Sequence, residues 1–268
     1  MKHAKTRRNP WRIVTIVASI VLVGSLIALG VIGFSYWQGQ DQYNKLREQS
    51  GLELPSDKES VSLAEMTIDW DSLRETNPDI VGWIVMPDTD IDYPIVQTTD
   101  NEYYLNHSFD KSQNWLASYG TIFLDATNNS QFLDSCNFIY GHHMNDGSMF
   151  AFLDKLTSQD NFDENRTIYV LTPRGNLRLT TFASVVTNGS DAIVQTNFSS
   201  AEDMDSYIMD KINRSCVTAE DAVEPALAST KIFGMSTCDY SVSDGRAILF
   251  SYVAESTIPG VSGVEQSN

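Results

Sequence analysis

The chain has 268 residues, of which 42% are hydrophobic and 15 are glycine. This is enough to bury a full-sized core and excludes both an intrinsically disordered chain and a disulfide-stapled miniprotein. Its 18 Lys and Arg against 35 Asp and Glu give a net charge of −17, which argues against nucleic-acid binding because a phosphate backbone would be repelled. The charge is uneven: five of the basic side chains and no acidic ones lie in residues 1–12.

An apolar segment follows this basic cluster. Residues 13–37 carry no charged side chain over 25 positions, whereas a helix needs about 20 apolar residues to cross a bilayer core. The segment lacks the polar face of a soluble amphipathic helix. Basic residues favour the cytoplasmic side, so we predict a single-pass anchor with residues 1–12 in the cytoplasm. A cleaved signal peptide is less favoured, because its apolar run is usually about 7–15 residues long and no clear cleavage site follows.

The chain after Trp37 is then expected outside the membrane. Residues 38–65 are polar with few clustered apolar positions and predict an extracellular stalk. Residues 66–268 form the exported domain. It contains Cys136, Cys216 and Cys238, an odd number, so at least one thiol is free.

Short runs of β-branched and aromatic residues, each bounded by Gly, Pro, Asn or Asp, recur through the exported domain and predict eight strands. A Pro/Gly/Asn turn at residues 172–176 predicts a hairpin. The fold class is therefore mainly β, as a closed barrel or a sandwich. The expected strands are Ile80–Val85, Tyr93–Gln97, Thr121–Leu124, Asn137–Tyr140, Thr167–Leu171, Leu177–Val186, Lys231–Met235 and Ala247–Val253.

Helical signals are fewer. Helices are expected over Ile68–Thr76 and after Ser199, with a helical turn near Phe150–Leu156. A capping box, Ser199-x-x-Glu202, begins the second of these helices. Its apolar positions, Met204, Tyr207, Ile208 and Ile212, share one face at helical spacing. This helix lies in the long connection between the sixth and seventh strands.

Cys238 ends the sequence KIFGMSTC, where a strand end can present a thiol to a cleft. A cysteine attacks as the thiolate and needs a nearby histidine or fixed cation. The adjacent His142 and His143 follow a strand and a glycine and are the candidate histidines. Cys136 and Cys216 have no basic neighbour at motif spacing, and we expect both to be packing residues.

Arg246 is the candidate cation. It lies eight residues after Cys238, directly before the last expected strand. If the two strands pair as neighbours, both residues lie at one edge of the sheet. An arginine stays charged and can donate two N–H bonds to a developing oxyanion.

Taken together, these motifs resemble the sortase family. The order is NFIYGHHMNDGSMF, then GMSTC, then an arginine before a terminal hydrophobic strand, behind an N-terminal anchor. The family's TLxTC-type motif appears as residues 234–238, which depart from it at the first two positions and keep Ser-Thr-Cys. The segment Ile80–Leu105, YGHHMNDGSMF and the helix between strands six and seven are similar to class B in particular.

The resemblance implies an eight-stranded β-barrel with N-terminal helices. It also implies a cysteine transpeptidase, a thiol-protease-like enzyme that anchors exported proteins to the cell wall of a Gram-positive bacterium. Such an enzyme cleaves a C-terminal sorting signal after Thr through a thioacyl intermediate and transfers the protein to a wall-precursor amine or a pilin lysine. No cofactor, metal or class A-like calcium site is implied.

The family's catalytic positions fall on Cys238, His142 and Arg246, with His143 as the second choice for the histidine. By the same matching, the substrate groove should be lined by Tyr140, Ser236, Thr237 and Asp239, and more weakly by Asn101 and Leu105.

Three alternatives stay open. A pilin-polymerising sortase fits the same residues. A papain-type wall peptidase is disfavoured because it would place its cysteine early, at a helix N-terminus, with the histidine downstream. A catalytically dead, membrane-tethered binding module is disfavoured by the intact trio.

Overall fold

The computed structural model describes residues 10–53, 62–113, 119–239 and 245–264, with the backbone alone for Cys238 and Asp239. Eight strands close into a barrel in the order β1-β2-β3-β4-β7-β8-β6-β5. The mainly β prediction is confirmed, and the closed barrel replaces the sandwich alternative. The strands are β1 (Ile80–Val85), β2 (Asp92–Val96), β3 (Ile122–Leu124), β4 (Cys136–Tyr140), β5 (Thr167–Thr172), β6 (Gly175–Asn188), β7 (Ile232–Asp239) and β8 (Gly245–Ser256).

The barrel mixes two kinds of strand pairing. Most neighbours are antiparallel, including the predicted β5–β6 hairpin, in which Thr172 pairs with Gly175. Two pairs, β2–β3 and β4–β7, are parallel. The prediction missed residues at the ends of several strands, and this matters most in β7. The predicted strand ends at Met235, whereas β7 continues to Asp239, so Cys238 lies inside the strand rather than beyond it.

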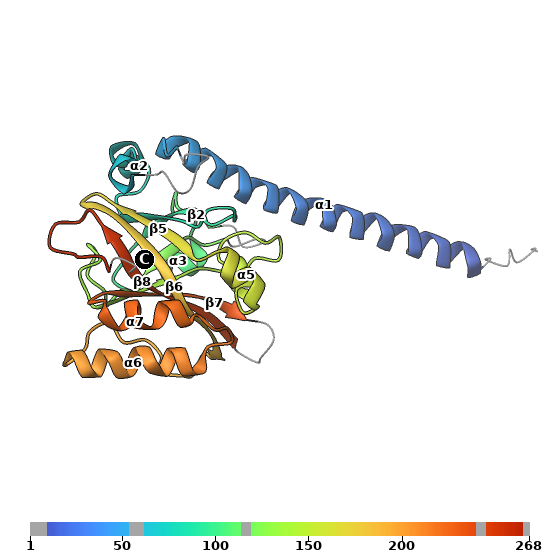
Figure 1. Ribbon diagram of the computed structural model, residues 1–268. Coiled ribbons are helices and arrows are strands. Elements are labelled where there is room, and N and C mark those ends of the chain that lie inside the picture. The colour runs from blue at the N-terminus through green and yellow to red at the C-terminus, as the bar shows by residue number, and fades with distance from the viewer. Residues whose placement is uncertain (1–9, 54–61, 114–118, 240–244, 265–268) are drawn as a thin grey trace, which may run out of the picture.

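Helices cover the outside of the barrel (Figure 1). Helices α6 and α7 lie on the side opposite α1 and α2, and α6 and α7 both fall in the connection between β6 and β7, as predicted for the helix after Ser199. The helices are α1 (Pro10–Ser50), η1 (Leu63–Glu65), α2 (Trp70–Thr76), α3 (Tyr103–Asn106), α4 (Phe152–Lys155), α5 (Gln159–Glu164), α6 (Ala201–Arg214) and α7 (Glu220–Ala228).

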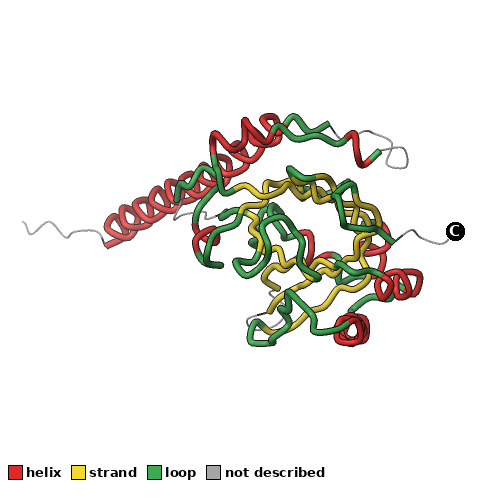
Figure 2. The backbone as a smooth tube through the Cα atoms, turned by 90° about the vertical axis from the view of Figure 1, so that its left-hand side faces the viewer, coloured by secondary structure: helices red, strands yellow, loops and turns green. Residues whose placement is uncertain are grey.

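Helix α1 is a single helix of 41 residues. Its N-terminal part is long and apolar enough to cross a membrane, with a mean hydropathy of 2.6, and it runs away from the barrel (Figure 2). Most of the basic cluster, residues 1–9, lies outside the described residues. The helix continues through the polar residues 38–50, where Tyr43 and Leu46 are buried in the core cluster. Part of the segment predicted as a stalk therefore packs against the barrel.

Helix α6 is capped one residue later than the sequence suggests. The Ser200 hydroxyl accepts a hydrogen bond from the backbone N–H of Asp203 at 3.2 Å, so Ser200 is the N-cap. Ser199 instead donates to the Asp203 carboxylate, which corrects the predicted Ser199/Glu202 capping box. The apolar face is as predicted, with Met204, Tyr207 and Ile208 buried and Ile212 packed against the core.

A buried lysine makes the stability of the fold depend on pH. Burial of Lys231, which donates to the Asp134 carbonyl at 2.5 Å, lowers its pKa to about 8. A lysine in the unfolded chain has a pKa of about 10.4, so above about pH 8 the unfolded chain binds more protons than the folded one. Burying the charged Lys231 therefore lowers the free energy of unfolding at neutral pH, and this penalty becomes smaller as the pH rises. The penalty at neutral pH is roughly 3 kcal/mol.

We therefore expect Lys231→Met to be more stable relative to wild type at pH 7 than at pH 10, by roughly 3 kcal/mol. Urea unfolding of both proteins at the two pH values measures this difference. A difference that does not change with pH would contradict a depressed lysine pKa.

Candidate active site

The parallel pairing of β4 with β7 brings distant parts of the chain to one end of the barrel. Tyr140 pairs with Ser236, and the backbone N–H of Gly141 donates to the Ser236 carbonyl at 3.1 Å. Because the two strands run in the same direction, the residues that follow them, His142 after β4 and Cys238 near the end of β7, lie at the same end.

The antiparallel pairing of β7 with β8 adds the arginine. The Cα partner of Cys238 is Arg246, which is the neighbouring-strand arrangement that the sequence analysis required. The backbone thus brings all three candidate catalytic residues to one end of the barrel, although more than 90 residues separate the histidine from the cysteine.

The His142 ring is fixed by a backbone carbonyl. Its Nε2 lies 2.5 Å from the carbonyl oxygen of Leu105. A carbonyl oxygen only accepts, so Nε2 carries a proton and donates it, and Nδ1 is left as the basic nitrogen of the neutral ring. The ring is half-buried, and this arrangement suits a group that gives and takes a proton at Nδ1.

His143 has a different environment. Its Nε2 lies 3.2 Å from the Asp154 carboxylate on α4, and its backbone forms a bridge with Met149. These contacts tie His143 to the turn that leads into α4. They favour His142 over His143 as the histidine beside the C-terminal end of β7.

Arg246 lies in the wall of a cavity. Its Nη1 donates to the Gly245 carbonyl at 2.8 Å, and its side chain is half-buried. The cavity has a volume of about 170 Å³ and is formed on one side by the barrel strands and on the other by the connection after β6. Its lining residues are Phe138, Tyr140, Thr187, Asn188, Ser236, Arg246 and Ile248 on the strands, with Gly189, Asp191, Ile193 and Val194 on the connection.

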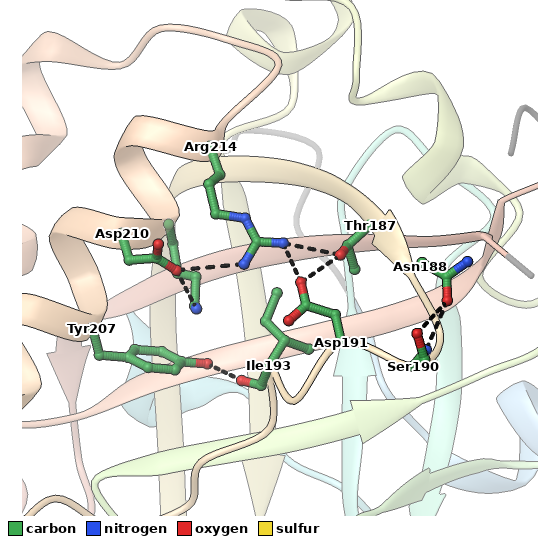
Figure 3. A network of polar contacts seen from close by, with 9 residues as sticks. Thr187, Asn188, Ser190, Asp191, Ile193, Tyr207, Asp210 and Arg214 are labelled. Atoms are coloured by element: carbon green, nitrogen blue, oxygen red, sulfur yellow. Dashed lines mark hydrogen bonds and ion pairs between the residues drawn. The ribbon is translucent and has the colours of Figure 1, made fainter.

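A polar network on α6 holds the connection side of this cavity (Figure 3). The Arg214 guanidinium donates to the Asp191 carboxylate and, at 2.9 Å, to the Thr187 hydroxyl, which itself donates to Asp191 at 2.7 Å. The Thr187 hydroxyl and then Arg214 lower the pKa of Asp191 below its ordinary value. Nearby, Tyr207 donates to the Ile193 carbonyl at 2.6 Å.

The structure brings some of the expected groove residues to the cavity and leaves others elsewhere. Tyr140 and Ser236 line it. Thr237 is 1% exposed, and its hydroxyl has no hydrogen-bond partner within the described residues. Asp239 pairs with Gly245 at the end of β7.

The two weaker candidates have structural contacts. Asn101 donates to Asp125 at 2.9 Å and accepts from the Ala126 backbone at 2.8 Å, so both ends of its amide are used outside the cavity. Asp125 also accepts from the Tyr140 hydroxyl at 2.9 Å, which links Asn101 indirectly to a cavity residue. Leu105 contributes the carbonyl that holds His142.

The two other cysteines differ from each other. Cys136 is completely buried, and burial raises the pKa of its thiol, in agreement with a packing role. Cys216 is exposed, so the expectation that it packs is wrong: α6 ends at Arg214, and Cys216 lies in the turn that follows rather than on the buried helix face.

Sequence reasoning missed the connection wall and its Arg214 anchor. The TNGSD sequence at residues 187–191 signals a turn, but contact with a cavity across the sheet leaves no mark in local sequence. An arginine such as Arg214 is common in the last turn of a helix because it interacts favourably with the helix dipole. Its position therefore gave no sign that it also bonds to Asp191 and Thr187 at the cavity wall.

Comparisons with known proteins agree with this geometry. No protein-family model matches the chain. It is 33% identical to sortase B of Listeria monocytogenes over 222 residues, covering 80% of this chain and 88% of that protein. It is 27% identical to sortase B of Staphylococcus aureus over 240 residues, covering 87% and 96%.

The fold comparison gives the same answer. The structure of the Staphylococcus aureus sortase B-substrate complex matches with a TM-score of 0.68 and 25% identity, covering 82% of this chain and 98% of that one. The barrel topology, the helices between β6 and β7, and this similarity over most of the chain lead to one conclusion: the chain belongs to the sortase family of cysteine transpeptidases, within class B.

Proposed function

We propose that this sortase is membrane-anchored and joins exported proteins to a cell-wall amine, with Cys238 as nucleophile, His142 as acid and base, and Arg246 as oxyanion donor. The observation that carries the proposal is the strand register. It places Cys238 opposite Arg246 and extends β4 toward His142 beside it, next to a cavity that Arg246 lines.

The first half-reaction forms a thioester. The Cys238 thiolate attacks the carbonyl carbon of Thr in the sorting signal, and the charge that develops on oxygen is held by the Arg246 guanidinium. Collapse of this intermediate breaks the peptide bond. His142, whose Nδ1 has taken the proton of the Cys238 thiol, gives that proton to the departing amine of the C-terminal fragment, which leaves His142 neutral and the rest of the substrate bound to sulfur.

The second half-reaction transfers the acyl group. A neutral His142 accepts a proton from the incoming amine, whose nitrogen attacks the thioester carbonyl. The Cys238 thiolate leaves, an amide bond remains in the product, and the enzyme returns to its starting state. Water in place of the amine would give hydrolysis.

The topology supports the setting of this reaction. An apolar helix with basic residues on its N-terminal side favours a cytoplasmic N-terminus and an external barrel. Secreted substrates and wall precursors both lie on that external side. The similarity to the Staphylococcus aureus sortase B-substrate complex also supports the cavity beside Arg246 as a substrate site.

The test is mass spectrometry of the full chain in detergent micelles, incubated with LPxTG-, NPxTN- and SPxTG-like peptides and with glycine or lysine amines. We expect an acyl adduct on Cys238 and a product that joins Thr to the amine. A lysine-only product would favour pilin polymerisation over wall anchoring. Cleavage by water alone, at equal rates with and without amine, would contradict transpeptidation.

The network of Figure 3 predicts a separate effect on substrate binding. Arg214→Lys removes the planar guanidinium, whose Nη2 donates to Asp191 and Thr187 while Nη1 donates to Asp210 at 3.5 Å, and so loosens the cavity wall. We expect the KM for the sorting peptide to rise by roughly two- to five-fold, the range of a partly exposed ion pair, with kcat little changed.

Steady-state kinetics of Arg214→Lys measures this effect. Arg178→Lys is the matched control, because Arg178 pairs with Glu255 at 3.1 Å near the other end of β6. An equal KM in the two variants would remove Arg214 from the account of the cavity.

A further inference from the structure

We propose that helix α1 positions the catalytic histidine, acting through Tyr119 and Gly120, in addition to tethering the barrel. The inference rests on the proposed role of His142. It concerns the part of α1 between Tyr36 and Arg47, where the helix leaves the predicted span and meets the barrel.

The first contact is between α1 and the Tyr119 ring. Gly39 lies against this ring so closely that an added Cβ would be only 2.5 Å from its Cδ2 atom. The Tyr119 hydroxyl lies 3.1 Å from the Tyr36 carbonyl, and the ring is buried. Glycine at position 39 is therefore what allows Tyr119 to dock on the helix.

The second contact joins α1 to the loop that carries the histidine. Asp146 lies in the segment between His142 and Phe150, which is closed by a hydrogen bond from the Phe150 N–H to the His142 carbonyl at 2.9 Å. The Asp146 carboxylate accepts from the Gln40 amide at 3.1 Å and from the Tyr119 hydroxyl. The loop is thus bonded both to the helix and to the tyrosine that the helix holds.

The third contact reaches the imidazole ring. Gly120 has a φ of +58°, and a Cβ added there would lie 2.9 Å from His142 Cδ2 and 2.9 Å from the Leu105 carbonyl oxygen. The Gly120 carbonyl accepts from the hydroxyl of Tyr43 on α1. Gly120 is therefore bonded to α1 through its carbonyl and lies close to the His142 ring, whose Nε2 bonds to the Leu105 carbonyl.

These contacts do not involve the residues that line the substrate cavity. Its lining residues come from β4, β6, β7, β8 and the connection after β6, and α1 contributes none of those that the described residues supply. A disturbance passed from α1 through Tyr119 should therefore displace the histidine and leave peptide binding intact. The kinetic signature is a fall in kcat at an unchanged KM, with kcat expressed per folded enzyme as measured by circular dichroism, because loss of folded molecules alone would also lower the apparent kcat.

The test compares two glycine substitutions in the same helix, made in the full chain in detergent micelles. Gly39→Ala places a methyl group against Tyr119, whereas Gly33→Ala meets nothing within 4 Å, and both remove a residue of poor helix propensity. We expect Gly39→Ala to lower kcat by roughly ten- to a hundred-fold, the cost of misplacing a catalytic group by about 1 Å, with KM unchanged. Gly33→Ala should match wild type.

A double variant tests whether the effect passes through the tyrosine. In a Tyr119→Ala background the methyl group at position 39 has no ring to displace, so adding Gly39→Ala should cause no further loss. Tyr119→Phe decides the matter if Gly39→Ala fails to fold. It keeps the ring and removes the hydroxyl contact to Asp146, and kcat should fall several-fold.

The outcomes separate this inference from the proposed function. If wild type is active, Cys238→Ala and His142→Ala are inactive, and both Gly39→Ala and Tyr119→Phe match wild type, then α1 is only a tether. If wild type transfers no peptide, or His142→Ala retains full activity, the proposed function itself fails.

Discussion

Replacing Cys238 by alanine should abolish both thioester formation and transfer of the sorting peptide. The nucleophile forms the covalent bond in the first half-reaction, and the neighbouring Ser236 and Thr237 hydroxyls are far weaker nucleophiles than a thiolate. Loss of a nucleophile of this kind lowers kcat on the order of 10⁴-fold or more. The measurement is peptide transfer together with the intact mass of the enzyme after incubation with substrate.

Cys216→Ala is the control for this experiment. Cys216 is an exposed cysteine and would react with any non-specific acylating agent, yet it lies in the turn after α6, where its backbone N–H donates to the Ser184 carbonyl of β6 at 2.8 Å. We expect wild-type transfer from this variant. An acyl adduct that survives in Cys238→Ala and disappears in Cys216→Ala would identify Cys216 as the acylated residue and contradict the proposed role of Cys238.

The second large effect is expected from Arg246→Lys. A lysine ammonium keeps the positive charge but loses the planar, forked donor that an arginine offers to an oxyanion. Removing one such donor from an acyl-transfer site costs about 10²–10³-fold in kcat. We expect a loss of that size, measured as the rate of thioester formation in single-turnover experiments.

Arg174→Lys controls for the change of side chain. Arg174 lies in the turn between β5 and β6, where it donates to Gln131, at the far end of the barrel strands from Arg246. A loss in Arg246→Lys no greater than that in Arg174→Lys would argue that the guanidinium only lines the cavity.

The barrel was predictable because its strands carry their own signals. Each run of β-branched and aromatic residues ended at Gly, Pro, Asn or Asp, and all eight predicted strands overlap the observed ones. The sequence also placed Cys238 and Arg246 together on the condition that their strands pair as neighbours, and β7 and β8 do pair, antiparallel, with these two residues opposite each other. Consecutive strands joined by a short connection commonly pair in this way.

Other features depend on contacts between distant segments. Residues 38–50 look like a polar stalk because Tyr43 and Leu46 are their only buried hydrophobic side chains, and the third buried residue, Ser50, is polar. Two buried side chains one turn apart are too weak a pattern to predict docking. Arg214 and the cavity wall were missed for the same reason, since the contact spans α6 and the turn after β6.

The parallel pairing of β4 with β7 also governs when activity can arise during folding. His142 follows β4, and Cys238 reaches it only after β5, β6 and the four helices α4, α5, α6 and α7 have been placed between them. Contacts of such long range form late and slowly. In the proposed topology the N-terminus stays in the cytoplasm and the barrel segments emerge in chain order, so Cys238 and His142 stay apart until β7 pairs with β4. Transfer activity is therefore expected to arise only when the barrel closes.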